Sequence, residues 1–372
     1  MVQLTYKMHV RLFVGYANLQ GGKRVKLIRN QSSVLRLRLW LRPHCVTFFF
    51  CVILLQLAGH AAALSSPSTA DTKETTAGEP LQVRLGYPAD AKLLILNADD
   101  LALAHAEDLA SFDALDKKWI TSATVMVPAP WFTEVVAYAK SHPNADLGLH
   151  LTLTSEWDTY RWGPVASRSA VPTLLASDGN LYPDAASVAK HARTDEVEIE
   201  LRAQIEHAIS LGLHPSHLDA HMHVLYATPE LFAVFLKVAN AYHLPIRMAR
   251  NDQLFAQRLN QLEPHFPIPD AIFSPSADVV PSHWVDYYVN LVKTLQPGVT
   301  EVFVHLAIDD AESEAIMVNH ADWGAAWRQR EFKAMSDPSF RKALQDNHVI
   351  LIGWRELGRL LQRDAEMYRS TR

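Results

Sequence analysis

Cysteine is almost absent from this chain, which has two cysteines among 372 residues. Both of them, Cys45 and Cys51, lie in or beside an apolar run near the N-terminus. If that segment is removed during export, the remaining chain can form no disulfide framework, no thiolate zinc site and no cysteine nucleophile. Enzymes that use a cysteine nucleophile or a thiolate-bound zinc are then excluded.

Acidic residues are missing from the N-terminal part of the chain, where no Asp or Glu precedes Asp71. Nine Lys and Arg residues fall between Lys7 and Arg42, and the apolar run Val46–Leu57 and the small residues Ala61–Ala63 follow them. This order is typical of a secretory signal peptide, and a run of twelve residues is short for a membrane span. We expect residues 1–63 to be a signal peptide with a long basic leader; the alternative is an uncleaved membrane anchor.

Charge is unbalanced once the leader is set aside, since 26 basic residues then face 40 acidic ones, a net charge near −14. Such a surface argues against nucleic acid and anionic lipid as partners. Residues 64–80 are rich in Ser, Thr, Ala and Pro, and we expect them to form a flexible linker. The sequence thus predicts an exported protein, periplasmic or extracellular, without an integral membrane domain after leader removal.

Residues 81–372 contain no second low-complexity break and are expected to form a single α/β domain. Short apolar runs alternate with helical segments, as in repeated βα units with parallel strands. The two clearest helical faces lie at Val197–Ile209 and Trp284–Leu295. A doubly wound open sheet and a closed barrel both fit this alternation. The expected strands are Leu93–Asn97, Ser122–Val127, Asp146–Leu153, Ser216–Asp219, Pro245–Met248, Glu301–Leu306 and Val349–Trp354.

Two adjacent carboxylates, Asp99 and Asp100, end the first expected strand. Neighbouring ionised carboxylates repel each other unless a cation lies beside them or one holds a proton. A metal ion satisfies both groups at once. The simpler interpretation is a helix cap or turn after the strand, since Asp is common at both.

Other ionisable residues also lie at expected strand ends. His150 interrupts an apolar strand, where alone it would more often be a packing residue. The series His217, Asp219, His221 and His223 places an ionisable group at every second position, so these side chains share one face while the chain is extended. A further strand ends at His305 and is followed by Asp309–Asp310, of which Asp310 fits an ordinary acidic turn.

Histidine and carboxylate ligands without sulfur suit Zn, Mn, Co or Mg, and a mixed set with open positions suits a catalytic ion. Such an ion lowers the pKa of water and polarises a carbonyl, and a second carboxylate nearby can accept the proton. Asp99 and Asp100 are consistent with this division of roles.

The sequence resembles the YdjC-like carbohydrate deacetylases, which act on N-acetylated sugars such as chitooligosaccharides. The matching pieces occur in family order and cover most of residues 93–361. They are Asn97–Asp100, Gly148–His150, Pro215–His223, Arg247 with Arg250, and the strand that ends at His305.

The resemblance implies a distorted seven-stranded (βα) barrel, similar to a TIM barrel. It implies that Asp100, His150 and His221 bind a divalent metal, Mg²⁺ as in the family, or Zn²⁺ or another transition metal. It also implies that a water molecule attacks the acetyl carbonyl with Asp99 as the base. His305 would protonate the leaving amine. The expected substrate-binding residues are Arg247, Arg250, His217, Asp219 and His223.

Three positions depart from the family pattern. Leu101–Ala102 stands where Phe-Gly is usual, Leu225 where a His is frequent, and Leu306 where a Pro is usual. None of these changes removes an expected ligand, but they suggest reshaped substrate loops. Aromatic residues within Glu156–Ala192 could form a sugar platform or could simply pack a long loop onto the barrel.

The expected function is removal of N-acetyl groups from an amino sugar by a metal-dependent hydrolase. Two alternatives remain open at this point: a secreted carbohydrate-binding protein with an inactive site, and a metal-dependent hydrolase of another amide or ester. The presence of both Asp99 and Asp100 argues against a pure binding protein, which needs no base beside a ligand. A homodimer is possible on sequence grounds.

We predict that the mature chain begins near Leu64, because the apolar run and the small residues at Ala61–Ala63 form a cleavage site. Intact-mass measurement of the protein from its native host should show loss of about the first 63 residues. A mass that retains the leader would contradict this prediction.

Overall fold

The computed structural model describes residues 15–18, 24–27, 78–262 and 266–370. The chain divides into two units, residues 1–70 and 71–372. In the first unit, β1 (Gly15–Asn18) and β2 (Arg24–Leu27) pair as an antiparallel hairpin. The expected apolar run, cleavage site and most of the linker lie outside the described residues, so their prediction stays open.

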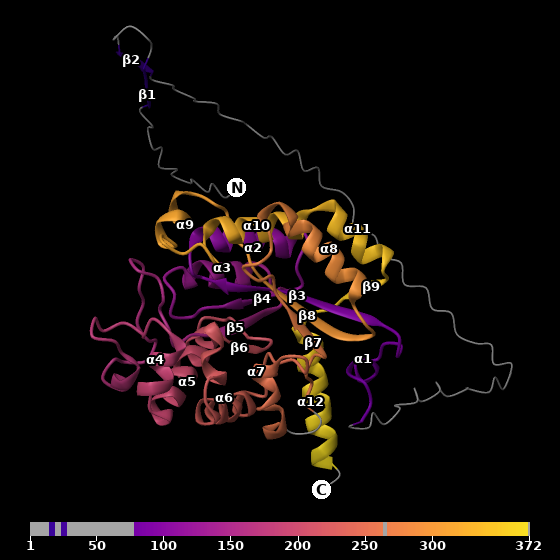
Figure 1. The fold of residues 1–372 in the computed structure, drawn as a ribbon. Helices are drawn as coiled ribbons and strands as arrows, with labels where there is room; N and C mark the ends of the chain where they lie inside the picture. The colour runs from indigo at the N-terminus through magenta and orange to yellow at the C-terminus, as the bar shows by residue number, and fades with distance from the viewer. Residues whose placement is uncertain (1–14, 19–23, 28–77, 263–265, 371–372) are drawn as a thin grey trace, which may run out of the picture. The chain divides into compact units, whose positions relative to one another are not determined.

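The second unit is built on a seven-stranded sheet in which every pairing is parallel. The strand order is β6-β5-β4-β3-β8-β7, and β9 pairs with β3 (Figure 1). The strands are β3 (Lys92–Leu101), β4 (Ser122–Val125), β5 (Leu147–Leu151), β6 (Leu218–Ala220), β7 (Ala271–Phe273), β8 (Gly298–His305) and β9 (Val349–Leu351).

Helices alternate with these strands, as the sequence predicts for βα units. In Figure 1, α2, α8, α10 and α11 lie along one side of the sheet, while α5 and α6 lie beside β5 and β6. The α-helices are α1 (Leu81–Arg84), α2 (His105–Asp116), α3 (Phe132–Ser141), α4 (Ala185–His191), α5 (Thr194–Ser210), α6 (Pro229–Tyr242), α7 (Gln253–Ala256), α8 (Trp284–Thr294), α9 (Ala311–Ile316), α10 (Ala325–Ser336), α11 (Pro338–Asp346) and α12 (Trp354–Ser370). Short 3₁₀ turns cover Pro172–Leu174, His221–Tyr226, Leu259–Gln261 and Pro281–His283.

The expected barrel is found in part, because the seven parallel strands form one sheet but strand pairing does not close it within the described residues. The expected strand Pro245–Met248 makes only a single bridge, from Ile246 to Leu218. Pro245 has no backbone N–H to donate, which limits the ladder at this edge. Sequence reasoning also missed β7, whose short apolar run lies between prolines.

Strand β3 separates two apolar clusters by the alternation of its side chains. Leu93 and Ile95 pack with Val299 and the α12 residue Trp354, whereas Leu94 and Leu96 belong to the larger cluster. The strand pairing shifts register between Ala98 and Leu101, and Asp100 has a φ of 66°. This bulge turns two neighbouring aspartates in different directions, as bulges do near active sites.

Two residues whose roles the sequence left open, Asp310 and Trp162, have ordinary structural roles. Asp310 caps α9 through hydrogen bonds to the backbone N–H groups of Glu312 and Ser313, which confirms the expected acidic turn. In the long loop after β5, Trp162 is buried and packs as part of the core. None of the helices within residues 78–262 and 266–370 is long and apolar enough to cross a membrane.

Replacement of Gly148 by Ala should destabilise the domain. Gly148 lies in β5, and an added Cβ would overlap the ring of His217, which is stacked on Trp354 at 4.6 Å between ring centroids. Forcing such an overlap in a packed core typically costs about 1–3 kcal/mol. Chemical denaturation should show this loss, whereas Gly78→Ala, where nothing lies within 4 Å of the added atom, should leave the midpoint unchanged. Equal midpoints for both variants would contradict the packing of His217 described here.

Candidate metal centre

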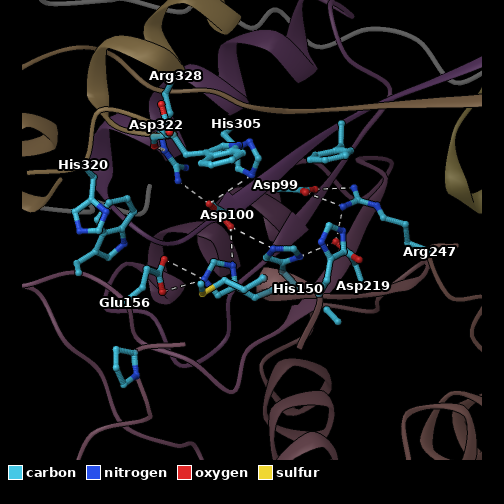
Figure 2. A pocket seen from close by; sticks show the side chains of 18 residues that line it. Asp99, Asp100, His150, Glu156, Asp219, Arg247, His305, His320, Asp322 and Arg328 are labelled. Carbon is cyan, nitrogen blue, oxygen red and sulfur yellow. Dashed lines mark hydrogen bonds and ion pairs between the residues drawn. The ribbon is translucent and has the colours of Figure 1, made fainter. Parts of the chain in front are cut away.

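A cavity of about 490 Å³ lies at the carboxyl ends of the strands. This is the edge where ligands bind in parallel α/β folds, and the volume is within the range of small-molecule sites. Figure 2 shows His150, His305 and Arg328 directed at Asp100. The lining residues are Asp99, Asp100, His150, Glu156, Trp157, Pro183, Asp219, Ala220, His221, Met222, His223, Arg247, Phe303, His305, His320, Asp322, Trp323 and Arg328.

Asp100, His150 and His221 meet at one point of this cavity, as the sequence predicts. Asp100 Oδ1 lies 3.2 Å from His150 Nε2 and 3.2 Å from His221 Nδ1, and all three residues are buried. Ligand atoms that are each about 2.1 Å from one ion lie about 3.0–3.4 Å apart, so this spacing fits a shared ion. Apart from these two ring nitrogens, the buried Oδ1 of Asp100 has no hydrogen-bond partner. The three side chains therefore fit a divalent metal.

Each of the two histidines also faces a carboxylate through its other ring nitrogen. His150 Nδ1 lies 2.8 Å from Asp219 Oδ2, and His221 Nε2 lies 3.0 Å from Glu156 Oε1. A carboxylate in this position fixes the ring orientation and the tautomer of a metal-binding histidine. His150 thus presents Nε2, and His221 presents Nδ1, toward Asp100.

The electrostatics of this group favour a positive charge between the three side chains. Burial by itself would lower the pKa of an imidazole, but Asp219 and Asp100 raise the pKa of His150 to about 9. Glu156 and Asp100 likewise overcome burial and raise the pKa of His221 to about 10. A site that stabilises protons on both rings also stabilises a metal cation that replaces them.

Arg328 of α10 binds the second carboxylate oxygen of Asp100. Its Nη2 donates a 2.8 Å hydrogen bond to Asp100 Oδ2. Burial would raise the pKa of Asp100, but Arg328 and His221 hold that pKa well below its ordinary value. Asp100 is therefore ionised, with Oδ2 bound to the guanidinium and Oδ1 directed at the two histidines.

Asp99 lies beside this group, with a carboxylate oxygen within 4.8 Å of a ring nitrogen of His150, and is held by Arg247. Arg247 Nη1 and Nη2 donate to the two carboxylate oxygens of Asp99 at 2.6 and 2.7 Å. Asn97 and Thr124 add hydrogen bonds to Asp99 Oδ1 at 2.8 and 2.9 Å. Burial opposes ionisation, but Arg247 and His150 keep the pKa of Asp99 below its ordinary value.

Asp99, His150 and Asp219 form a second close group of possible ligands. Here the guanidinium of Arg247 donates to both Asp99 and Asp219, so its charge already neutralises these carboxylates. A metal cation at this point would be repelled by Arg247. The group around Asp100 is therefore the better metal site.

His305 approaches the cavity from the end of β8. Its Nε2 is 3.9 Å from Asp100 Oδ2, on the side of the site where Arg328 lies (Figure 2). Glu331 of α10 accepts a 2.6 Å hydrogen bond from the backbone N–H of His305 and lies 3.7 Å from its Nδ1. The imidazole is thus placed so that Nε2 faces the cavity, where it can exchange a proton with a bound group.

Comparison with known proteins identifies the family of this chain. A sequence model of the YdjC-like protein family matches residues 93–346. The chain belongs to this family. The match confirms the resemblance seen in the sequence, and it includes every strand end that carries an expected metal ligand.

Relatives of this YdjC-like protein include proteins named carbohydrate deacetylase. The one from Thermus thermophilus is 32% identical over 279 residues, 73% of this chain and 96% of the relative. The one from Brevibacillus brevis is 29% identical over 71% of this chain and 99% of the relative. A chitooligosaccharide deacetylase from Serratia marcescens is 29% identical over 43% of this chain and 61% of the relative.

A solved structure shares the fold of this YdjC-like protein. The crystal structure of a protein described as a putative cellobiose-phosphate cleavage protein, from Enterococcus faecalis V583, superposes with a TM-score of 0.61 at 25% identity. The match covers 72% of this chain and 99% of that one. The α/β arrangement of parallel strands is therefore common to both.

The five residues expected to bind substrate are placed differently from one another. Asp219, His223 and Arg247 line the cavity, but Asp219 and Arg247 are engaged with each other. His217 is fully buried, stacks on a tryptophan and does not line the cavity, and burial lowers its pKa to about 3. The side chain of Arg250 is exposed and also lies outside the lining.

Sequence reasoning missed the residues that hold the ligands in place. Glu156 follows β5 by a few residues, and its position after a strand end was a usable signal. Arg328 and Glu331 lie three positions apart on α10, and therefore on one helical face. Helical periodicity alone could not show that this face meets the strand ends.

Replacement of Glu156 by Gln should weaken metal binding, because His221 would lose the carboxylate that orients it. Loss of such an outer carboxylate typically lowers metal affinity about 10–100-fold. Competition titrations with a metal-chelating dye should measure this change. The matched control is Asp158→Asn, an exposed acid-to-amide change on the same loop, which should keep the wild-type affinity. Equal affinities for the Glu156 variant and the wild type would contradict the role given to Glu156.

Proposed function

We propose that this YdjC-like protein is an exported hydrolase that removes the N-acetyl group from an amino sugar. Two findings support this proposal: relatives aligned over nearly their whole length are named carbohydrate deacetylase, and the site has the groups that amide hydrolysis needs. The observation that carries it is the convergence of Asp100, His150 and His221 in one cavity that the carboxylate of Asp99 and the imidazole of His305 also line.

A divalent ion held by Asp100, His150 and His221 would polarise the acetyl carbonyl and lower the pKa of a water molecule. The family resemblance predicts Mg²⁺, whereas two imidazoles and one carboxylate also suit Zn²⁺ or another transition metal. The chain supplies ligands on three different strand ends, which leaves one side of the ion site open to the cavity.

Asp99 is the proposed base. The carboxylate is ionised because Arg247 stabilises its charge, and it lies next to the metal ligands without being one of them. It can accept a proton from the water molecule whose oxygen forms the new bond to the acetyl carbon. The hydrogen bonds from Arg247, Asn97 and Thr124 fix its position, which lowers the cost of orienting it.

His305 is the proposed acid. Its Nε2 faces the cavity on the side of Asp100 where Arg328 lies, and a leaving group can lie there (Figure 2). As the carbon–nitrogen bond breaks, His305 would donate a proton to the sugar nitrogen, so that the products are acetate and a free amino sugar. Arg328 is close enough to Asp100 to keep that ligand ionised throughout.

Acetate release tests the proposal directly. Purified mature protein should release acetate from some member of a panel of N-acetylated mono- and oligosaccharides. The release should stop with a chelator and return with Mg²⁺, Mn²⁺, Co²⁺ or Zn²⁺. A metal-loaded protein that binds saccharides but releases no acetate would favour a carbohydrate-binding protein. Cleavage of other acetylated amides or esters alone would favour a different hydrolase.

Substitutions of the two adjacent aspartates should affect metal binding and activity differently. Asp100→Ala removes a ligand, so metal occupancy and activity should fall together. Asp99→Asn keeps the shape and one acceptor oxygen but cannot take the proton, so kcat should drop by about two to four orders of magnitude while metal stays bound. Metal analysis and initial rates on the same samples separate the two effects. Loss of metal in Asp99→Asn with retention in Asp100→Asn would reverse the roles.

A further inference from the structure

The metal ligand Asp100 lies in a turn whose backbone is strained at two positions. Asp100 has a φ of 66° and Ala102 has a φ of 78°, and both residues are buried. The left-handed region is disfavoured for residues with a Cβ, and Gly is usual in the family where Ala102 stands. Strain of this kind persists only where the surrounding structure enforces it. A contact from outside the turn is therefore needed to hold Ala102.

Asp108 supplies such a contact from the first turn of α2. Its Oδ1 accepts a 2.7 Å hydrogen bond from the backbone N–H of Ala102, and the residue is fully buried. The backbone carbonyl groups of Leu101 and Ala102 accept hydrogen bonds of 2.8 and 3.0 Å from the N–H groups of Met126 and Trp131. These backbone bonds fix the carbonyl side of the turn, and Asp108 fixes its N–H side.

The carboxyl group of Asp108 is held in its neutral form. Burial raises the pKa of Asp108 to about 9, and the charges of Glu134 and Glu107 add to the rise, although the hydrogen bond from Ala102 opposes it. A neutral buried carboxyl group forms no charge pair that could stabilise the fold. What it offers the turn is an acceptor oxygen at a fixed place, and an Asn side chain carries an acceptor oxygen at the same place.

We propose that Asp108 is a positioning residue for the metal: its bond to Ala102 sets the direction in which Asp100 presents Oδ1 to the two histidine ligands. The pairing of β3 with β8 ends at Asp99, and its pairing with β4 shifts register around Asp100, so strand pairing alone does not fix this ligand. The bond to Asp108 limits how far the turn can rotate. Asp108 itself does not line the cavity. This inference rests on the metal site of the proposed function.

Metal affinity and stability, measured on the same folded variants, test this role. Asp108→Ala should lower the affinity for Zn²⁺ about tenfold, as loss of the outer support of a metal ligand typically does, and Asp108→Asn should stay within about twofold of the wild type. Competition titration with a metal-chelating dye measures the affinity, and chemical denaturation measures the stability. The matched control is Asp113→Ala on the same helix, which removes a surface ion pair with Lys117 and should leave the affinity unchanged.

A second arm relieves the strain in the turn. Gly adopts a positive φ without strain, so Ala102→Gly in the Asp108→Ala protein should restore most of the lost affinity. Crystals of the metal-free Asp108→Ala protein should show Asp100 Oδ1 displaced from its place 3.2 Å from His150 Nε2, and crystals of the double variant should show it returned. If Asp108→Ala does not fold, Asp108→Ser replaces it in both arms, because the Ser hydroxyl ends one atom short of the carboxyl oxygen that binds Ala102.

The outcomes separate this inference from the proposed function. A lower denaturation midpoint for Asp108→Ala with unchanged metal affinity would show that Asp108 only caps α2, and would overturn the positioning role. An affinity that Ala102→Gly fails to restore would overturn it too. A wild type that binds no divalent metal would refute the metal site of the proposed function, whereas displacement of Asp100 in the metal-free crystals of Asp108→Ala would still support the positioning role.

Discussion

The structure depends on a single guanidinium that lies among three buried carboxylates. Arg247 donates to Asp99, Asp219 and Glu301, all of them nearly inaccessible to solvent. Burial, with Asp219 and Asp99 close by, raises the pKa of Glu301 to about 7 despite the charge of Arg247. Removing one partner from such a buried group leaves uncompensated charge and typically costs about 3–5 kcal/mol. The positive charge of Arg247 therefore allows β3, β6 and β8 to place these three buried carboxylates close together.

The two arginines Arg247 and Arg328 also give the adjacent residues Asp99 and Asp100 different roles. The bulge in β3 turns the two carboxylates apart, so that Arg247 binds one and Arg328 binds the other. Arg247 satisfies both oxygens of Asp99, whereas Arg328 takes only Oδ2 of Asp100. Oδ1 of Asp100 is left facing two histidines that the outer carboxylates orient. The same pattern of charge thus separates a base from a metal ligand in adjacent residues.

The sequence was sufficient to predict those strands, helices and site residues that follow a local pattern. The runs at Leu93–Asn97 and Glu301–Leu306 become β3 and β8, and the helical face at Trp284–Leu295 becomes α8, because burial imposes the period that the sequence shows. The group Asp100, His150 and His221 was predictable because parallel strand ends meet at one edge. His217 was placed on the same face as His221, but in the structure His217 is packed in the core and the chain leaves the strand at His221. Arg328 and Trp323 could not be placed, because their contacts depend on how α10 and the turn before it meet the sheet.

Diffraction at the absorption edge of a bound metal tests the central claim most directly. Crystals of the protein loaded with Zn²⁺ or Mn²⁺ should show an anomalous peak about 2.0–2.2 Å from Asp100 Oδ1, His150 Nε2 and His221 Nδ1. Arg247 should still bind Asp99 in the same crystals, and Glu156 should still face His221. A peak between Asp99 and Asp219, with Arg247 displaced, would contradict the account, as would a fully loaded protein whose metal lies outside this cavity.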